Sequence, residues 1–146
     1  MSAEKDAELE KVVDGIRAAI EREERVLYSE KVIQEAYNPQ NVGRMAKPDS
    51  VGVITGPCGD TMEFYLKVTN GQIKEITFMT DGCGATIACG SALTKMVKGR
   101  SVDDAYGTTE EDLLNALGGL PEENLHCSKL AIATLRVALD ECKKGR

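Results

Sequence analysis

The sequence predicts an α+β fold, in which helices pack on one three-stranded antiparallel sheet. The central part of the chain alternates apolar and polar residues as strands do, whereas the flanking parts repeat apolar residues every three or four positions as helices do. The pair Asn70-Gly71 separates two alternating segments and is the strongest short signal for a β-hairpin. The strands also follow one another directly, without helices between them, which is typical of an antiparallel sheet.

The length and composition indicate one acidic domain. A chain of 146 residues can bury a core without disulfides or metal. Its net charge of −6 argues against nucleic-acid binding, which depends on Lys and Arg contacts to phosphates. No apolar run approaches the length of a membrane span, and the start, MSAEKDAELEKVV, resembles neither a signal peptide nor a transit sequence. We therefore expect no nucleic-acid or membrane partner and a cytoplasmic location, where thiols stay reduced.

The N-terminal part is expected to be helical. Apolar residues recur at helical spacing over residues 4–36, and Asn38-Pro39 ends the pattern. Ser29 can cap a new helix, so we expect a break near Tyr28-Ser29. The chain is then divided into an N-terminal helical extension, residues 1–27, and a main domain, residues 28–146. The extension either packs on the domain or forms an exposed arm, and it is the candidate element for a homodimer.

Three strands are expected over residues 51–55, 61–69 and 72–80. The second strand places its larger apolar residues on one face, and in the third strand Ile76 and Phe78 mark the apolar face. The apolar residues on this face of the second strand are Met62, Phe64, Leu66 and Val68.

Helical periodicity returns after the third strand. The segment ATIACGSALTKMVKG ends at Gly99, and Thr108 with Glu111 has the spacing of a capping box for the next helix. Pro121 opens the last segment, whose helix runs to about Lys143. Its expected apolar face consists of Leu130, Ala131, Leu135, Ala138, Leu139 and Cys142.

Three short stretches carry the residues suited to chemistry. GPCGD contains Cys58 and Asp60 before the second strand, DGCGA contains Cys83 after the third, and LHCS contains His126 and Cys127 near the start of the last helix. In a hairpin the start of one strand lies beside the end of its partner, so both loops are expected at one end of the sheet. If the last helix begins there, three thiols, one imidazole and one carboxylate can hold zinc or an iron–sulfur cluster.

Plainer interpretations exist for each of these residues. A single cysteine is commonly a core residue, which is our expectation for Cys89 and Cys142. His126 alone would be a surface residue and Asp60 alone a turn residue. The ligand spacings are long, so chemistry alone leaves metal binding and core packing equally open. A catalytic Cys–His pair is disfavoured because the single histidine is adjacent to Cys127. A plain interaction module, bound through the N-terminal helix, would leave these residues unexplained.

These stretches carry a resemblance to a known family. The blocks YSEKVIQEAYNPQNVG, GPCGDTMEFYLKV, ITFMTDGCGATIA, VKGRSVDDA and LHCSKLA resemble the IscU/NifU N-terminal family of iron–sulfur cluster assembly scaffolds. The resemblance implies the same α+β fold and a scaffold or carrier in place of an enzyme. It implies sulfur delivery as a persulfide by a cysteine desulfurase, iron, a [2Fe–2S] cluster and apo-protein acceptors. The residues that it places around the cluster are Cys58, Asp60, Cys83, His126 and Cys127.

The chain departs from the family pattern at Leu120–Asn124, which reads LPEEN where relatives often have an LPPVK-like segment. This difference argues against the DnaK-like chaperone that recognises the segment. The long insertion of the zinc-binding SufU branch is absent, which favours the IscU side. The alternative function is a zinc-binding sulfur acceptor that activates a desulfurase, and zinc is also a candidate occupant of the purified scaffold.

Three hypotheses concern the roles of the individual ligands. The carboxylate of Asp60 is a harder ligand than a thiolate, so it is expected to keep the cluster labile. Cys127, near a helix N-terminus, is expected to have a lowered thiol pKa and to accept the persulfide. His126 and Cys127 are adjacent, so they are expected to exchange as ligands.

Overall fold

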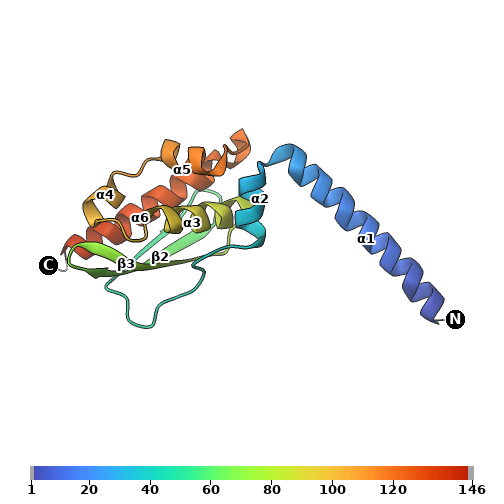
Figure 1. Cartoon of the computed structure of the whole chain (residues 1–146), viewed down its shortest axis with the longest axis horizontal. Coiled ribbons are helices and arrows are strands. Elements are labelled where there is room, and N and C mark those ends of the chain that lie inside the picture. The colour runs from blue at the N-terminus through green and yellow to red at the C-terminus, as the bar shows by residue number, and fades with distance from the viewer. Residues whose placement is uncertain (1, 145–146) are drawn as a thin grey trace.

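The computed structural model describes the backbone of residues 2–144 and the side chains of residues 6–20, 22 and 27–144. One antiparallel sheet, in the order β1-β2-β3, carries helices on one face, and α1 projects from the domain (Figure 1). The predicted α+β architecture is therefore confirmed. Within residues 2–144 no helix is both long and apolar enough to cross a membrane. The elements are α1 (Ser2–Leu27), α2 (Glu30–Tyr37), β1 (Ser50–Thr55), β2 (Thr61–Thr69), β3 (Gln72–Thr80), α3 (Gly84–Val97), α4 (Val102–Tyr106), α5 (Glu110–Leu117), the 3-10 helix η1 (Glu122–Asn124) and α6 (Leu125–Lys144).

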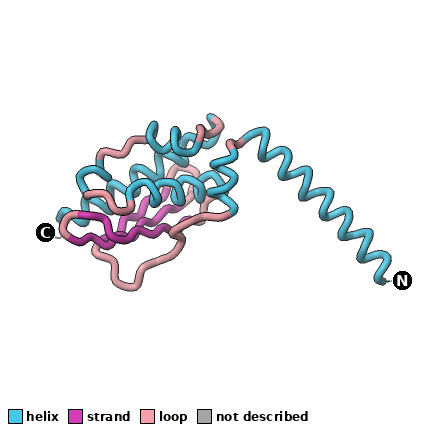
Figure 2. Tube along the Cα trace, in the orientation of Figure 1, coloured by secondary structure: helices cyan, strands magenta, loops and turns pink. Residues whose placement is uncertain are grey.

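Two helices cover the sheet. α6 lies over β1 and β2, α3 lies over β3, and α2 packs against α3. α6 packs tightly on β1 at Gly52, where an added methyl group would lie 2.5 Å from backbone atoms of Thr134 and Ala138. The loop of residues 38–49 begins beside α3 and the edge of β3 and then extends beyond the sheet on the side away from the helices (Figure 2). This loop is attached to the edge of β3, because the Phe78 N–H donates to the carbonyl of Asn41 at 2.9 Å.

The core follows the sequence pattern closely. Met62, Phe64 and Leu66 are fully buried on the helix-covered face of β2, as their alternation predicts. The hairpin turn has φ values of 53° at Asn70 and 77° at Gly71, and both are positive as a type I′ turn requires. The predicted apolar face of α6 is buried throughout, Cys142 included, and Cys89 in α3 is also buried.

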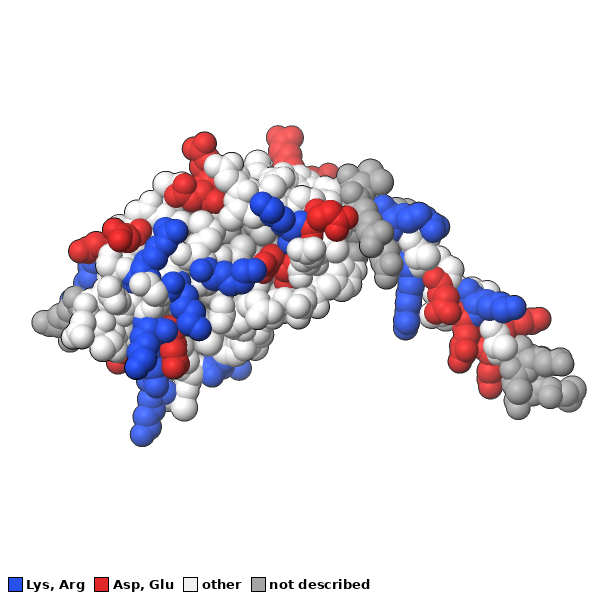
Figure 3. Space-filling view, in the orientation of Figure 1, with Lys and Arg blue, Asp and Glu red and all other residues white. Residues whose placement is uncertain are grey.

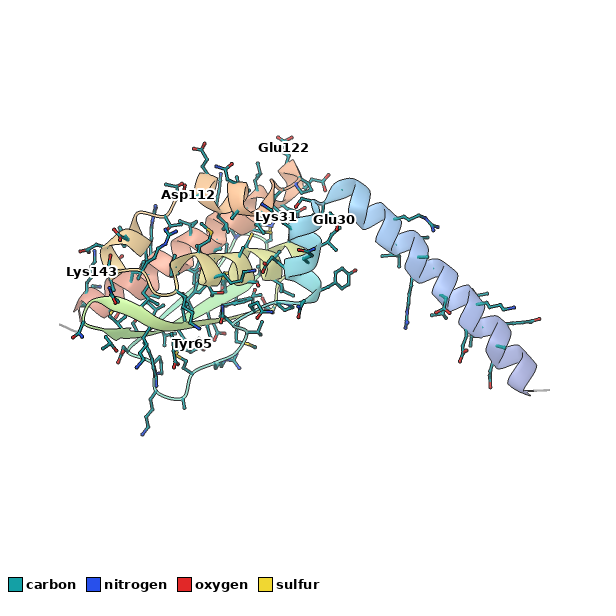
Figure 4. All side chains as sticks on the ribbon, viewed as in Figure 1. Glu30, Lys31, Tyr65, Asp112, Glu122 and Lys143 are labelled. Carbon is teal, nitrogen blue, oxygen red and sulfur yellow. The ribbon has the colours of Figure 1, made fainter. Side chains whose placement is uncertain are left out.

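The predicted break between the first two helices is confirmed. α1 ends at Leu27 and α2 begins at Glu30. Ser29 caps α2, because its hydroxyl oxygen accepts a hydrogen bond from the Val32 N–H at 3.1 Å. The same hydroxyl donates to the carbonyl of Leu117, which ties this junction to the end of α5. Figure 4 labels Glu30 and Lys31 at this junction, where the chain enters the domain.

The third strand differs from the prediction by a β-bulge. Lys67 pairs with Glu75 but Val68 pairs with Ile73, so Lys74 is an extra residue in β3. The bulge brings Ile73 onto the same buried face as Ile76, whereas strict alternation would place these two side chains on opposite faces.

The capping box of α5 lies one residue later than predicted. The Thr109 hydroxyl accepts from the Asp112 N–H at 3.1 Å, and the Asp112 carboxylate accepts from the Thr109 N–H at 2.9 Å. Thr108 is instead buried, and its hydroxyl has no hydrogen-bond partner among the described residues. The short helices α4 and η1 were not predicted, because segments of five and three residues are too short to show a periodic pattern.

Candidate metal centre

The three cysteine-bearing stretches meet at one end of the sheet. β2 begins where β3 ends, since Met62 pairs with Thr80, and the Thr61 N–H donates to the Asp81 carboxylate at 2.7 Å. The turn between β1 and β2 also reaches α6, because a methyl group added to Gly56 would lie 3.5 Å from the side chain of Leu130. The end of β3, the β1–β2 turn and the first turns of α6 therefore form one surface, as the hairpin argument predicts.

Cys83 is an exposed thiol of this surface. It is the N-cap residue of α3, and its Sγ lies 3.7 Å from the Thr86 hydroxyl oxygen one turn further along the helix. Partial burial acts to raise the pKa of Cys83, but hydrogen bonds from the backbone and hydroxyl of Thr86 and from Ala85 outweigh it. The pKa of Cys83 therefore lies below its usual value.

Cys127 has the opposite environment. It lies in the first turn of α6, is 0% exposed, and receives a hydrogen bond from the Thr86 hydroxyl at 3.3 Å. Burial raises the pKa of Cys127, and the hydrogen bond offsets this only in part. The predicted lowering of this pKa is therefore wrong, because the cost of burying a thiolate exceeds the stabilisation that the Thr86 hydroxyl provides.

His126 extends this chain of contacts. Its Nε2 lies 3.6 Å from the Cys127 Sγ, and its side chain is partly exposed. Cys83, Thr86, Cys127 and His126 thus form a continuous series that runs from the surface into the core and out again. The two thiols of this series are also close enough for each to affect the pKa of the other.

Cys58 and Asp60 lie on the neighbouring turn. The turn is held by backbone hydrogen bonds from Gly56 to Asp60 at 2.8 Å and from Gly59 to Gly56 at 3.0 Å, and Cys58 is exposed on it. Gly59 has φ of 87°, a value that favours glycine. Among the described residues, no three Cys, His, Asp or Glu side chains converge closely enough to hold a metal ion. The structure therefore gathers the five predicted residues at one end of the sheet without closing them around one point.

Two contributing residues were missed from the sequence. Thr86 bridges Cys83 and Cys127, and its position three residues after Cys83 on a helix is the signal that could have found it. Asn124, the last residue of LPEEN, interacts with the Cys127 side chain and accepts a hydrogen bond from the Tyr28 hydroxyl at 3.1 Å. No short sequence motif predicts the role of Asn124, because its contact with Cys127 depends on how η1 leads into α6.

A largely apolar pocket of about 340 Å³ opens beside Cys83, between α2 and the start of α3. It provides room for a partner's side chain next to the exposed thiol. Its lining residues are Tyr28, Val32, Ile33, Ala36, Tyr37, Cys83, Gly84 and Ala85.

The fold and this site define a class of protein: a small α+β domain that presents thiols from a loop and two helix starts at the end of a three-stranded antiparallel sheet. Residues 27–146 match the family model described as the NifU-like N terminal domain, and the chain belongs to that family. The resemblance found in the sequence is thereby confirmed, and the match leaves α1 almost entirely outside.

Two relatives and one solved structure show the extent of the similarity. The iron-sulfur cluster assembly scaffold protein IscU 1 of Archaeoglobus fulgidus is 44% identical over 114 residues, which cover 77% of this chain and 74% of the relative. The scaffold protein IscU of Aquifex aeolicus is 43% identical over 124 residues, covering 82% and 79%. The crystal structure of a nitrogen-fixing NifU-like protein (N-terminal) from Brucella abortus superposes with a TM-score of 0.63 over 80% of this chain and 94% of that one. At 19% identity, this last likeness shows the fold alone.

Proposed function

We propose that this protein is a scaffold on which an iron–sulfur cluster is assembled as cargo and then passed to apo-proteins. The observation that carries the proposal is the series Cys83–Thr86–Cys127–His126, which places two thiols and an imidazole beside the turn that bears Cys58 and Asp60. Relatives at 44% and 43% identity are named as scaffold proteins for this assembly, which supports a carrier in place of an enzyme.

The donor set suits a [2Fe–2S] cluster. Thiolates are soft ligands that bind iron–sulfur units well, and histidine replaces cysteine in some clusters. Three cysteines with either His126 or Asp60 would supply four ligands, and the remaining residue is then free to exchange. Closing the site requires the β1–β2 turn to approach the two helix starts. The glycines around Cys58 and Cys83 leave room for this approach.

A cysteine desulfurase is the proposed sulfur source. Its persulfide would pass its outer sulfur to a scaffold thiolate, leaving the desulfurase thiolate and a scaffold persulfide. We propose Cys127, which lies between Thr86 and His126, as the acceptor of the sulfur. Because Cys127 is buried, the first turn of α6 has to open before its thiol can react. Cys83, whose pKa lies below its usual value, is the competing acceptor. Mass spectrometry of the Cys127→Ser, Cys83→Ser and Cys58→Ser variants decides: normal persulfide on Cys127→Ser and its loss on either other variant would overturn the assignment.

Reconstitution under anaerobic conditions tests the scaffold role itself. The full chain is incubated with iron, cysteine and a desulfurase, and its visible absorption and Mössbauer spectra are recorded. We expect broad absorption bands and a two-iron signature that Cys58→Ser abolishes, followed by transfer to an apo-ferredoxin. A colourless protein with one tightly held zinc per chain would instead indicate the zinc-bound sulfur acceptor.

Asp60 sets the lifetime of the cargo in this proposal. Replacing the hard carboxylate by Asp60→Ala should give a cluster that persists longer and transfers more slowly, measured as the decay of absorption and the rate of ferredoxin loading. A cluster lost faster than from the unmodified chain would contradict this role. The chaperone specific for LPPVK is not among the partners we propose, because the corresponding segment of this chain, Leu120–Asn124, reads LPEEN.

A further inference from the structure

α1 carries a stripe of exposed apolar side chains. Leu9, Val12, Ile16 and Ile20 recur at intervals of three and four residues and are 62%, 57%, 54% and 49% exposed. Val13 and Leu27 extend the stripe, at 38% and 63%. Isolated exposed apolar residues are ordinary on protein surfaces, but six of them aligned on one helix face are typical of a helix that packs against another element.

This stripe has no partner within the described chain. α2 is the only described element that α1 contacts beyond isolated residue pairs, and the helix points away from the domain (Figure 1). In proteins, most helical stability comes from packing an amphipathic face and little from intrinsic propensity. An unpaired α1 would therefore lack its main source of stability and would expose its apolar stripe to water.

We propose that the stripe packs against α1 of a second copy of this protein, in antiparallel orientation. The stripe is defined by Leu9, Val12, Val13, Ile16, Ile20 and Leu27. This inference is independent of the proposed cluster chemistry, because α1 lies outside the site. It concerns an interaction surface that the family match does not cover, since that match begins at residue 27.

The charges beside the stripe favour a second copy that runs in the opposite direction. Residues 2–14 contain five acidic residues and two lysines, whereas residues 15–27 contain three acidic residues and all three arginines of α1. In an antiparallel pair centred on Gly15, Glu8 of one copy faces Arg22 of the other, and Glu10 lies near Arg17. Among the described side chains of α1, Figure 3 shows basic ones on the inner part and mainly acidic ones on the outer part. In a parallel pair, the acidic halves of the two α1 helices would lie beside each other and repel.

The position of the domain supports the same orientation. Each domain follows the C-terminal end of its α1, so an antiparallel pair places the two domains at opposite ends of the helices. α1 has 26 residues, which corresponds to a length of about 39 Å at the usual helical rise. The two domains are thus kept apart, and both cysteine-bearing surfaces stay accessible. A parallel pair would bring both domains to the same end.

Light scattering coupled to size-exclusion chromatography tests the pairing on the full chain. We expect a mass of twice 15.8 kDa for the unmodified protein. Ile16→Asp places a charge at the centre of the stripe and should raise the dimer dissociation constant by about 100-fold. Ala18→Asp is the matched control, because it adds the same charge on the opposite side of the helix and should leave the dimer intact. Thermal unfolding followed by circular dichroism confirms that the domain is folded in both variants.

Charge exchange tests the orientation. Glu8→Arg alone and Arg22→Glu alone should each weaken the dimer by about tenfold, and the double variant should restore it. A monomer at every concentration, a dimer insensitive to Ile16→Asp, or a larger oligomer would overturn the proposed pair. Failure of the double variant to restore the dimer would overturn the antiparallel orientation. Hydrogen exchange that shows α1 protected in a monomer would mean that the helix folds back on its own domain.

Discussion

The hydroxyl group of Thr86 lowers the pKa of both Cys83 and Cys127, and removing it is the sharpest test of the site. Thr86→Val keeps the size and β-branched shape of the side chain. It removes the hydroxyl that lies 3.7 Å from the Cys83 Sγ and donates to the Cys127 Sγ at 3.3 Å. Thr86→Ser is the matched control, because it keeps the hydroxyl and loses only a methyl group.

The size of the effect follows from the geometry. A hydrogen bond to an ionised group contributes about 1.5–3 kcal/mol when buried. The Cys83 thiol is exposed and its distance to the hydroxyl is long, so solvent screening reduces this to about 1 kcal/mol. The thiolate fraction of Cys83 should therefore fall about fivefold at neutral pH. The backbone N–H groups of Ala85 and Thr86 remain and keep part of the stabilisation.

Alkylation by iodoacetamide, followed by peptide mass spectrometry, measures each cysteine separately. The pKa of Cys83 lies below its usual value and that of Cys127 above it, so Cys83 should react well before Cys127 as pH rises. In Thr86→Val the Cys83 profile should move to higher pH, while Thr86→Ser should follow the unmodified chain. Equal labelling of Cys83 in all three proteins, or faster labelling of Cys127 than of Cys83, would refute the reasoning.

Three further predictions concern stability, measured by chemical denaturation. Thr109→Ala should cost about 1 kcal/mol by removing the cap of α5, whereas Thr108→Ala should cost less because that hydroxyl is unpaired; equal losses would contradict the capping box. Burial raises the pKa of Cys89, so this thiol stays neutral in the folded state but ionises in the unfolded state at high pH. The free energy of unfolding should therefore fall as pH rises above about 9, and Cys89→Ala should weaken that dependence. Gly90→Ala should destabilise the protein by about 2 kcal/mol, because the added methyl group would lie 2.4 Å from the ring of Phe78. In Gly15→Ala the added methyl group meets nothing within 4 Å, so this change should stabilise α1.

Local patterns were sufficient for most of the fold. The alternation of β2, the Asn70-Gly71 turn and the apolar face of α6 each depend on near neighbours in sequence, and each was predicted correctly. The bulge in β3 was not, because it depends on a distant segment: the Ile73 N–H donates to the carbonyl of Arg100 at 2.8 Å, and the Gly99 N–H donates to the carbonyl of Ile73 at 2.8 Å. No periodicity within β3 contains that information.

The capping box shows a different limit. Thr108 with Glu111 and Thr109 with Asp112 have the same spacing, so both satisfy the sequence rule. The choice between them is made by tertiary structure, which buries Thr108 and leaves Thr109 exposed at the helix start.

For the site, the sequence was sufficient to predict which residues share an end of the sheet. It was not sufficient to predict their ionisation. Cys127 begins a helix, a position that favours a thiolate, but its burial depends on the docking of α6 against α3 and the sheet. Desolvation is a property of the assembled core, and for Cys127 it outweighs the hydrogen bond from Thr86.

The contact between Thr86 and Cys127 has a consequence for how this protein would fail. Both residues are fully buried, so the spacing of the cysteines at the starts of α3 and α6 is fixed by how these helices pack against each other. Close-packed interiors transmit small displacements, and coordination bonds tolerate only a few tenths of an ångström. A heat-sensitive substitution in this interior should therefore weaken the binding of iron and sulfur at temperatures where the chain is still folded. Cells that carry such a substitution would lack clusters while containing normal amounts of the protein.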